Sequence, residues 1–370
     1  MKLLTALLLA LISLGACAPV VVPAGPPIRE AAIEPFVAPP MPWHPWPAYA
    51  LAPSPPRPEP SGPRPESSLV MPDGTHLPLR VWRPEGAPRF VVVALHGLTD
   101  HGGNFLLEGG PLLTAGGAVV YAYDQRGFGW NRARGYWPGS DALIADAREA
   151  IRLLRARHPG VPVFLLGESM GGAVALAAGP TDVDGVILTS PGIWGGPYLS
   201  KFLRGLLWGA SHALGPLAMP SGAAGITASD NMEALRRFSS DPLVLHNVRL
   251  DMVAGIVELM DRAVAALPHC CGDVPVLLMA GGKDEVVPTR IARRALRDAQ
   301  FPRVAFYPEG WHLLLRDSIR AEIARDILAF LADPRTPIPA ETDRQAATGS
   351  PARRPETENG RWIDSTRPSF

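Results

Sequence analysis

The stretch VFLLGESMGGAVAL, residues 163–176, places one serine between glycines where an apolar strand gives way to a helix. Gly167, Ser169 and Gly171 fit the pattern G-x-S-x-G, in which the serine occupies a strained strand-to-helix turn. The flanking glycines let neighbouring backbone approach without a Cβ clash. The turn exposes the hydroxyl at a helix N-terminus, where free N–H groups favour developing negative charge. The stretch therefore predicts a reactive serine.

Short runs of β-branched and apolar residues recur on both sides of this stretch, with helical patterns such as 141–158 and 318–332 between most of them. Unbroken apolar runs are typical of strands buried on both faces, which indicates an α/β fold with a mostly parallel sheet covered by helices. We expect strands at 67–71, 77–84, 90–97, 118–124, 161–168, 184–191, 274–282 and 302–309.

One interval, 192–272, interrupts this alternation because it contains apolar positions at helical spacing and no strand run. It is far too long for an ordinary connection between two core strands. We therefore expect a helical cap at 192–272, which forms a separate layer over one end of the sheet. The core then consists of 67–191 and 273–333.

Both ends of the chain have the composition of segments that cannot form a packed core. Between Pro19 and Pro65 lie 17 of the 42 prolines, so 18–66 is predicted to be a disordered, polyproline-like linker. The segment 334–370 is low in apolar residues and is predicted to be a disordered tail.

The first 17 residues, MKLLTALLLALISLGAC, have the layout of a secretory signal and are too short to span a membrane. LGAC resembles the bacterial lipobox, in which the cysteine, here Cys17, becomes the lipidated first residue of the mature protein. Ala18 stands where Asp would favour the inner membrane. The resemblance implies an exported protein of the bacterial envelope, anchored in the outer membrane; an ordinary signal with an incidental cysteine is the alternative.

The charge balance argues against a nucleic-acid partner. Lys plus Arg and Asp plus Glu both number 35, and no basic cluster alternates with aromatic residues. Hydrophobic residues make up 47% of the chain, which is enough for a sizeable core.

Beyond Cys17 the chain has only Cys270 and Cys271, which are adjacent in sequence. A framework of structural disulfides is therefore excluded. A vicinal disulfide would need a distorted peptide, and a metal site that includes His269 is short of ligands. We expect two unpaired, partly buried thiols and no bound metal.

A serine nucleophile needs a base, and the base must be held by a carboxylate. In this topology the acid and then the histidine follow the serine in the chain. His312 is the one histidine beyond the strand at 274–282, and Asp284 follows that strand at the edge where active-site groups gather. We predict a Ser169, Asp284 and His312 triad, with Glu285 as the alternative acid.

Five motifs in order, HGLTDHGGNF, YDQRGFGWN, GESMGG, GGKDEVVP and YPEGWH, make residues 67–333 resemble an α/β-hydrolase of the monoacylglycerol lipase and lysophospholipase branch, also labelled serine aminopeptidase-like. The resemblance implies an eight-stranded sheet, a helical cap between strands six and seven, and no cofactor. It also implies an oxyanion hole formed by the backbone N–H groups of Leu98 and Met170. His96 is then expected to shape the loop.

The resemblance implies hydrolysis of acyl esters, with a lipid or small ester as substrate. Peptide or amide hydrolysis and acyl transfer on the same triad are alternatives, as is a non-catalytic lipoprotein that binds a partner at the envelope. Trp130 and Asn131 stand where the branch usually has a small polar residue, so the channel wall is expected to differ there. Asp124 and Arg126 are predicted to form a structural pair that braces this loop.

Overall fold

The structure is a computed structural model that describes residues 21, 25–27, 29–38, 59–179, 182–221 and 225–341. The signal at 1–17 with Cys17, part of the linker at 18–66, and residues 342–370 of the tail lie outside the described residues. Among the described helices, none is both long and apolar enough to cross a membrane.

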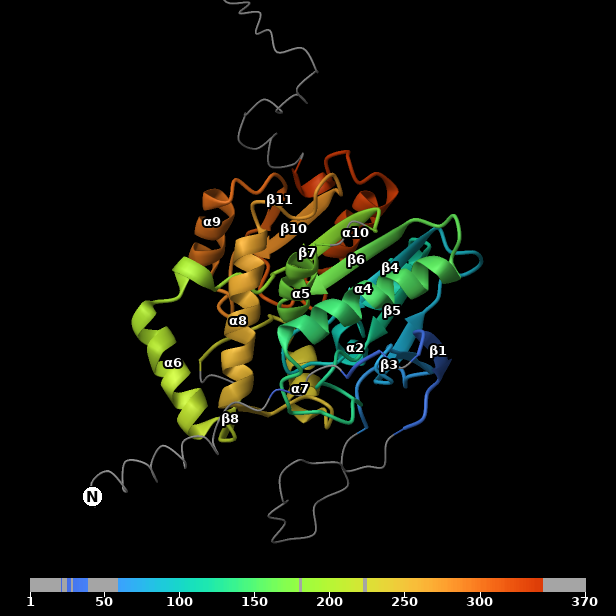
Figure 1. The fold of residues 1–370 in the computed structure, drawn as a ribbon. Helices are drawn as coiled ribbons and strands as arrows, with labels where there is room; N and C mark the ends of the chain where they lie inside the picture. The colour runs from blue at the N-terminus through green and yellow to red at the C-terminus, as the bar shows by residue number, and fades with distance from the viewer. Residues whose placement is uncertain are drawn as a thin grey trace, which may run out of the picture.

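The core is a nine-stranded sheet in the order β1-β2-β3-β5-β4-β6-β7-β10-β11 (Figure 1). In this sheet the pairs β1–β2, β2–β3 and β3–β5 are antiparallel. All other neighbouring strands in it are parallel. All eight expected strands are present. The strands are β1 (Ala32–Pro35), β2 (Ser67–Val70), β3 (His76–Trp82), β4 (Phe90–Leu95), β5 (Ala118–Tyr123), β6 (Val163–Glu168), β7 (Gly185–Thr189), β10 (Val276–Gly281) and β11 (Val304–Tyr307).

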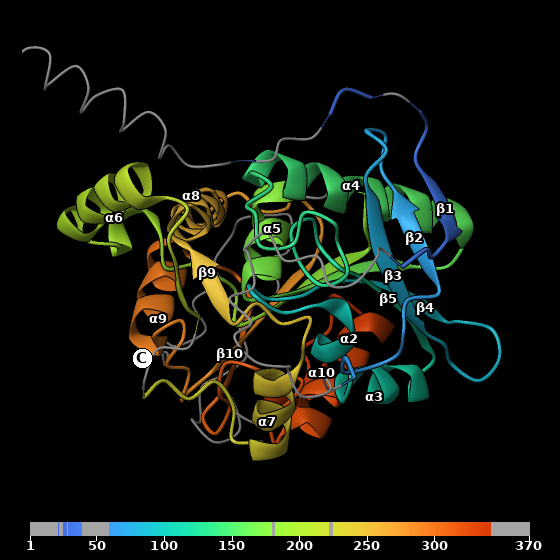
Figure 2. The ribbon, with the colours of Figure 1, turned by 90° about the horizontal axis from the view of Figure 1, so that it is seen from below.

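Helices cover both faces of the sheet (Figure 2). Along β4, Val91 and Val93 pack into one apolar cluster with α4, α5, α8 and α9, whereas Val92 packs into a second cluster with α3 and α10. This alternation explains why the strand reads as a continuous apolar run. These helices are α2 (Gly102–Phe105), α3 (Gly109–Ala115), α4 (Ser140–Arg157), α5 (Met170–Ala178), α8 (Leu250–Ala266), α9 (Thr289–Asp298) and α10 (Arg320–Ala332).

The ninth strand, β1, lies inside the segment predicted to be a disordered linker, and the prediction is wrong there. Ile33 pairs with Leu69 across an antiparallel ladder that extends the sheet beyond β2. Phe36 then donates its N–H to the carbonyl of Glu66 and packs edge-on against Trp130 at 5.9 Å between ring centroids. Gly25 and Arg29 also donate their N–H groups to the carboxylate of Asp73 and the carbonyl of Pro72, so hydrogen bonds hold this part of the proline-rich segment against the core.

The insertion between β7 and β10 is mainly helical, as expected, with η1 (Gly196–Tyr198), α6 (Lys201–Leu214), α7 (Met232–Ser240) and α8. It also contains β8 (Ala218–Pro220) and β9 (Asn247–Arg249), which form an antiparallel pair that the sequence did not predict. The expectation of a separate layer holds only in part, because α8 contributes Met252 and Leu259 to the same apolar cluster as α5.

The start of the predicted tail is ordered by packing. Ile338 is fully buried in the cluster beneath α10. Glu341 accepts hydrogen bonds from the guanidinium of Arg303, which also donates to the carbonyls of Pro334 and Thr336. Residues 334–341 therefore belong to the folded core, and the prediction of a disordered tail is wrong for this part.

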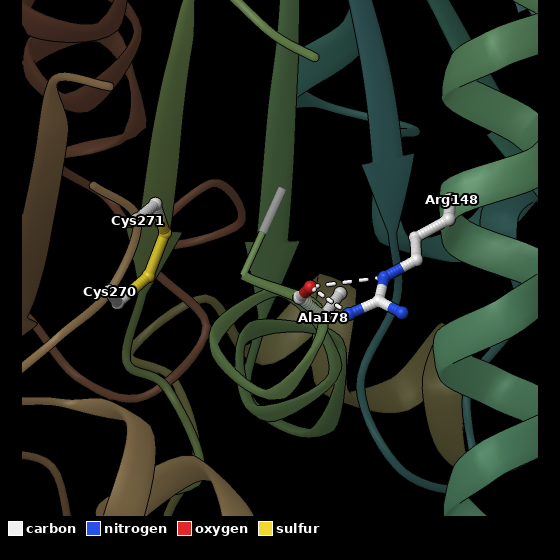
Figure 3. The surroundings of a disulfide bond; sticks show 4 residues. All are labelled: Arg148, Ala178, Cys270 and Cys271. Carbon is white, nitrogen blue, oxygen red and sulfur yellow. Dashed lines mark hydrogen bonds between the residues drawn. A yellow bond between two sulfur atoms is a disulfide. The ribbon is translucent and has the colours of Figure 1, made fainter. Parts of the chain in front are cut away.

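The expectation of two free thiols is also wrong, because Cys270 and Cys271 form a disulfide across a cis peptide bond (Figure 3). The cis geometry brings the Cα atoms to 3.2 Å and both sulfurs to one side of the chain. In the same region, Arg148 of α4 donates to the carbonyl of Ala178 at the end of α5. Within the described ranges no three His, Cys, Asp or Glu side chains gather to hold a metal ion.

Candidate active site

Ser169 occupies the junction between β6 and α5 with φ 53° and ψ −113°, a backbone conformation that a side-chain-bearing residue rarely adopts. Glycine is required on both sides of the serine because backbone atoms lie too close for a Cβ. A Cβ on Gly171 would lie 2.2 Å from the carbonyl oxygen of Leu95, and one on Gly167 would lie 2.5 Å from the carbonyl oxygen of Gly171. The sequence pattern thus produces the strained turn because only glycine fits on either side of the serine.

The backbone of the turn is fixed by three hydrogen bonds. Ser169 donates its N–H to the carbonyl of Thr189 at 3.0 Å, and its own carbonyl accepts from Ala173 at 3.0 Å and Gly192 at 2.8 Å. The turn is therefore tied to α5, to the end of β7 and to the segment that follows it.

Asp284 and His312 lie together at the same edge of the sheet. Nδ1 of His312, on the loop after β11, is 2.8 Å from Oδ2 of Asp284, on the turn after β10, and both side chains are buried. The other oxygen of Asp284 accepts the N–H groups of Val286 and Val287, at 2.9 Å each. The carboxylate is thus held in place while one oxygen remains directed at the imidazole.

The alternative acid, Glu285, does not contact His312. It is exposed, and its carboxylate accepts the N–H of Thr227 at 2.8 Å. Of the two acidic residues considered from the sequence, only Asp284 is placed to orient the histidine.

The Asp284 carboxylate also changes the acidity of the imidazole. Burial acts to lower the pKa of His312, but the charge and hydrogen bond of Asp284 outweigh it, so that the pKa lies above the ordinary value of 6.5. A histidine in this setting is stabilised as the imidazolium, the form that a general base acquires when it takes a proton.

Ser169 and His312 are brought to the same edge but are not bonded to each other. In the part of the chain that the structure describes, no hydrogen bond joins Oγ of Ser169 to the imidazole of His312. The histidine loop is instead fastened to the insertion, since His312 and Leu313 donate their N–H groups to the carbonyl of Ala228, at 3.1 and 3.0 Å. Catalytic hydrogen bonds commonly tighten only when substrate is bound.

The two expected oxyanion donors, Leu98 and Met170, belong to segments that adjoin the serine. Met170 is the first residue of α5, where N–H groups have no partner within the helix. Leu98 follows β4 in a loop that passes against the nucleophile, because a Cβ on Gly97 would lie 3.4 Å from Cβ of Ser169. Next to it, His96 is buried between the carbonyl of Gly97 and the N–H of Gln125, so it shapes the loop as expected.

Asp124 and Arg126 do not pair with each other, which corrects that expectation. Asp124 bonds to Arg80 at 2.5 Å and accepts the N–H groups of Gly102 and Trp130. Arg126 pairs with two other carboxylates, Asp73 at 2.7 Å and Asp146 at 2.8 Å. Both residues brace the loop after β5, but through separate networks.

The sequence reasoning missed a buried charged cluster beside the triad, formed by Asp100, Glu168 and Arg316. The sequence does contain one signal for this cluster. Glu168 occupies the variable position before the serine at the end of a fully apolar strand, where a charge requires a partner.

A family model described as serine aminopeptidase, S33 (Hydrolase_4) matches residues 86–319. Monoglyceride lipase of Rattus norvegicus is 28% identical over 256 residues, covering 67% of this chain and 84% of that protein. Monoacylglycerol lipase of Mycolicibacterium smegmatis is 26% identical over 270 residues, covering 70% of this chain and 93% of that protein.

Solved structures show the same fold. The monoacylglycerol lipase of Paleococcus ferrophilus superposes with a TM-score of 0.59 at 24% identity, over 70% of this chain and 99% of that chain. A soluble variant of monoglyceride lipase from Saccharomyces cerevisiae, in complex with a substrate analogue, gives a TM-score of 0.61 at 19% identity, over 76% and 100%. With an α/β-hydrolase fold and a family match over more than half of its length, this chain belongs to the serine aminopeptidase S33 (Hydrolase_4) family of α/β-hydrolases.

Proposed function

We propose that the protein is a serine hydrolase that cleaves acyl esters of lipid-like substrates, of the monoacylglycerol or lysophospholipid type, through an acyl-enzyme on Ser169. The observation that carries this proposal is the buried hydrogen bond between His312 and Asp284, at the sheet edge that also bears the strained turn of Ser169. A binding protein would have no need of these three groups together.

In the proposed reaction, Nε2 of His312 takes the hydroxyl proton as Oγ of Ser169 bonds to the ester carbonyl carbon. The resulting oxyanion accepts hydrogen bonds from the N–H groups of Leu98 and Met170. The imidazolium then protonates the departing alcohol, which leaves the acyl group on the serine. Water, deprotonated by the same imidazole, releases the acid and restores the hydroxyl. Throughout, Asp284 keeps the Nδ1 proton in place.

Two observations favour a lipid-like substrate. The relatives in the comparison are named monoglyceride or monoacylglycerol lipases. In addition, α6 of the insertion leaves large apolar side chains in solvent, including Phe202 at 83% and Trp208 at 64% exposure. Exposed apolar side chains on the insertion suit contact with aggregated or membrane-derived lipid.

Peptide or amide hydrolysis is the second candidate, because the family description names an aminopeptidase. The same acyl-enzyme chemistry serves both bonds, and the difference lies in protonation of the leaving group. The test of function therefore includes an amide substrate.

We further propose that the protein is exported and lipid-anchored through Cys17 in the bacterial envelope, with the outer membrane as its location. The support is the sequence of the first 17 residues and the lipobox-like LGAC. Val21, four residues after Cys17, forms a β-bridge with Trp137, and Gly25 donates its N–H to Asp73, so the anchor would lie close to the folded core. Mass spectrometry of the N-terminal peptide tests this directly: a diacylglyceryl thioether on Cys17 supports it, and a free cysteine or an N-terminus elsewhere overturns it.

The function is tested with the full chain and its Ser169→Ala variant. Substrates are p-nitrophenyl esters from short to long acyl chains, monoacylglycerol, a lysophospholipid and an aminoacyl p-nitroanilide. We expect the variant to lose about 10⁶-fold in turnover on esters, as loss of a triad serine does elsewhere. Folded wild type that cleaves only the anilide would move the assignment to amide hydrolysis, and no cleavage at all would overturn the enzyme proposal.

A further inference from the structure

The guanidinium of Arg316 is buried four residues after His312, on the same loop. Its side chain is only 2% exposed. It donates from one terminal nitrogen to Oδ2 of Asp100 at 2.6 Å and from the other to Oε1 of Glu168. One cation is thus shared between two buried carboxylates.

Each group in this cluster belongs to a different loop of the candidate site. Glu168 directly precedes Ser169 in the strained turn, and Asp100 lies two residues after Leu98. Asp100 is itself fixed, because its second oxygen accepts the N–H of His101 and the side-chain amide of Asn104, at 2.8 Å each. One guanidinium therefore joins the loops of the nucleophile, the oxyanion donor and the base.

Such a buried bridge is specific in geometry. A guanidinium presents its donors in a planar fork, so two carboxylates bound to different nitrogens are held at a fixed separation and angle. A lysine at the same place would keep the charge but lose the fork. Among the side-chain hydrogen bonds and ion pairs of the described residues, those of Arg316 alone join these three loops through one side chain.

The cluster also acts electrostatically on the histidine. The negative charge of Glu168 raises the pKa of His312 and the positive charge of Arg316 lowers it, beside the larger effect of Asp284. Burial raises the pKa of Glu168 to about 7, against the opposing charges of Arg316 and His312, while Asp100 raises it further. The charge state of Glu168 beside Arg316 therefore changes the electrostatic field at His312.

We propose that Arg316 is a positioning residue that fixes the separation of the Ser169 turn, the Leu98 loop and the His312 loop through its bonds to Glu168 and Asp100. The proposal rests on the proposed function, since it assigns Arg316 a role in that reaction. In the described structure the hydrogen bonds of the Arg316 guanidinium go to Asp100 and Glu168 and not to Ser169 or His312, so it acts through the residues next to them.

The test compares wild type with Arg316→Lys and Glu168→Gln. A control is Arg126→Lys, because Arg126 is equally buried and also bridges two carboxylates, but neither of them adjoins a triad residue. For each protein we would measure thermal unfolding, kcat and KM on a short soluble ester across pH, and the rate of labelling by a fluorophosphonate. The label reports a nucleophilic serine whatever the natural substrate is.

For Arg316→Lys we expect kcat and the labelling rate to fall by about 10- to 100-fold with KM within about twofold, since small displacements of reacting groups cost this much. For Glu168→Gln we expect the acid limb of kcat/KM to move to lower pH, because a carboxylate that raises the pKa of His312 is removed. The control is expected to lose stability with its pH profile unchanged.

The outcomes separate the two proposals. If wild type is not labelled, the serine is not a nucleophile and the proposed function fails. If wild type is labelled but Arg316→Lys keeps wild-type kcat and labelling, or only matches the control, the positioning role is overturned. Should Arg316→Lys fail to fold, Glu168→Gln decides: an unmoved acid limb with wild-type kcat overturns the proposal.

Discussion

Ser229, on the insertion, donates its hydroxyl to Oδ1 of Asp317 at 2.5 Å, and both side chains are fully buried. The second oxygen of Asp317 accepts the N–H of Trp311 at 2.7 Å. Asp317 thus links the insertion to the loop that carries His312 and also closes that loop on itself. The insertion is therefore part of the support of the candidate base, in addition to covering the site.

Asp317 makes stability depend on pH in a direction that can be measured. Burial raises its pKa to about 6 from 3.8, against the hydrogen bonds from Ser229 and Trp311, while Asp230 raises it and Arg316 lowers it. Between these values the folded state binds more protons than the unfolded state. The free energy of unfolding contributed by this group therefore falls as pH rises from about 4 to 6, by up to about 3 kcal/mol.

We expect Asp317→Asn to remove this dependence. Urea unfolding of wild type and variant at several pH values between 4 and 7 would show the variant gaining stability relative to wild type as pH rises. A difference between the two proteins that stays constant over this range would show that Asp317 does not titrate there.

The predicted acid, Asp284, can be distinguished from its neighbour Glu285 by substitution. In Asp284→Asn the amide would favour the wrong tautomer of His312, and we expect kcat to fall by about 10⁴-fold with the fold intact. Glu285→Gln is the matched control, because it changes the adjacent carboxylate, which bonds to Thr227. Ester hydrolysis by both variants, with circular dichroism to confirm folding, checks this. A similar loss in Glu285→Gln would contradict the assignment.

Much of the fold could be predicted because its signals are local. The central strands β4, β5 and β10 are uninterrupted apolar runs. The turn at Ser169 is recognisable from two glycines whose positions leave no room for a Cβ. Chain order and position after strands predicted Asp284 and His312 as partners, and the two side chains are hydrogen-bonded. The strands that were missed, β1, β8 and β9, are only three or four residues long and carry no clear pattern.

The remaining features depend on contacts between residues distant in the chain. Arg316 and Glu168 are separated by 148 positions, and neither local sequence indicates the other. Likewise, Arg126 has Asp124 two residues away but pairs with Asp73 and Asp146 instead. Long-range charge pairing is decided by how loops meet at the sheet edge, which periodicity and composition do not specify.

The glycine after the nucleophile offers a steric test of the turn. In Gly171→Ala the new Cβ would lie 2.2 Å from a backbone oxygen of β4, which cannot move without displacing the strand. We expect a loss of about 1–3 kcal/mol in stability together with a loss of activity. Gly205→Ala is the control, since nothing lies within 4 Å of its Cβ on exposed α6. That change should stabilise by about 0.5–1 kcal/mol. Chemical unfolding measures the stability of both variants. Equal changes in the free energy of unfolding would contradict the steric argument.

The exposed apolar side chains of α6 predict a difference between dispersed and aggregated substrates. Phe202, Leu206 and Trp208 are each more than half exposed on one helix that contains no acidic residue. Burying such side chains in a lipid interface is favourable by about 1.5–3 kcal/mol each. We therefore expect replacement of all three by serine to reduce binding to phospholipid vesicles and hydrolysis of vesicle-borne monoacylglycerol by at least tenfold. Hydrolysis of a short soluble ester should stay within about twofold, because these side chains point into solvent.

Vesicle sedimentation and the two assays provide the measurement. Val37→Ser is the control, since Val37 is also highly exposed but lies beside β1, away from the insertion. If both substrates were affected equally, α6 would be supporting the fold of the insertion. If neither substrate were affected, these three side chains would have no part in lipid contact.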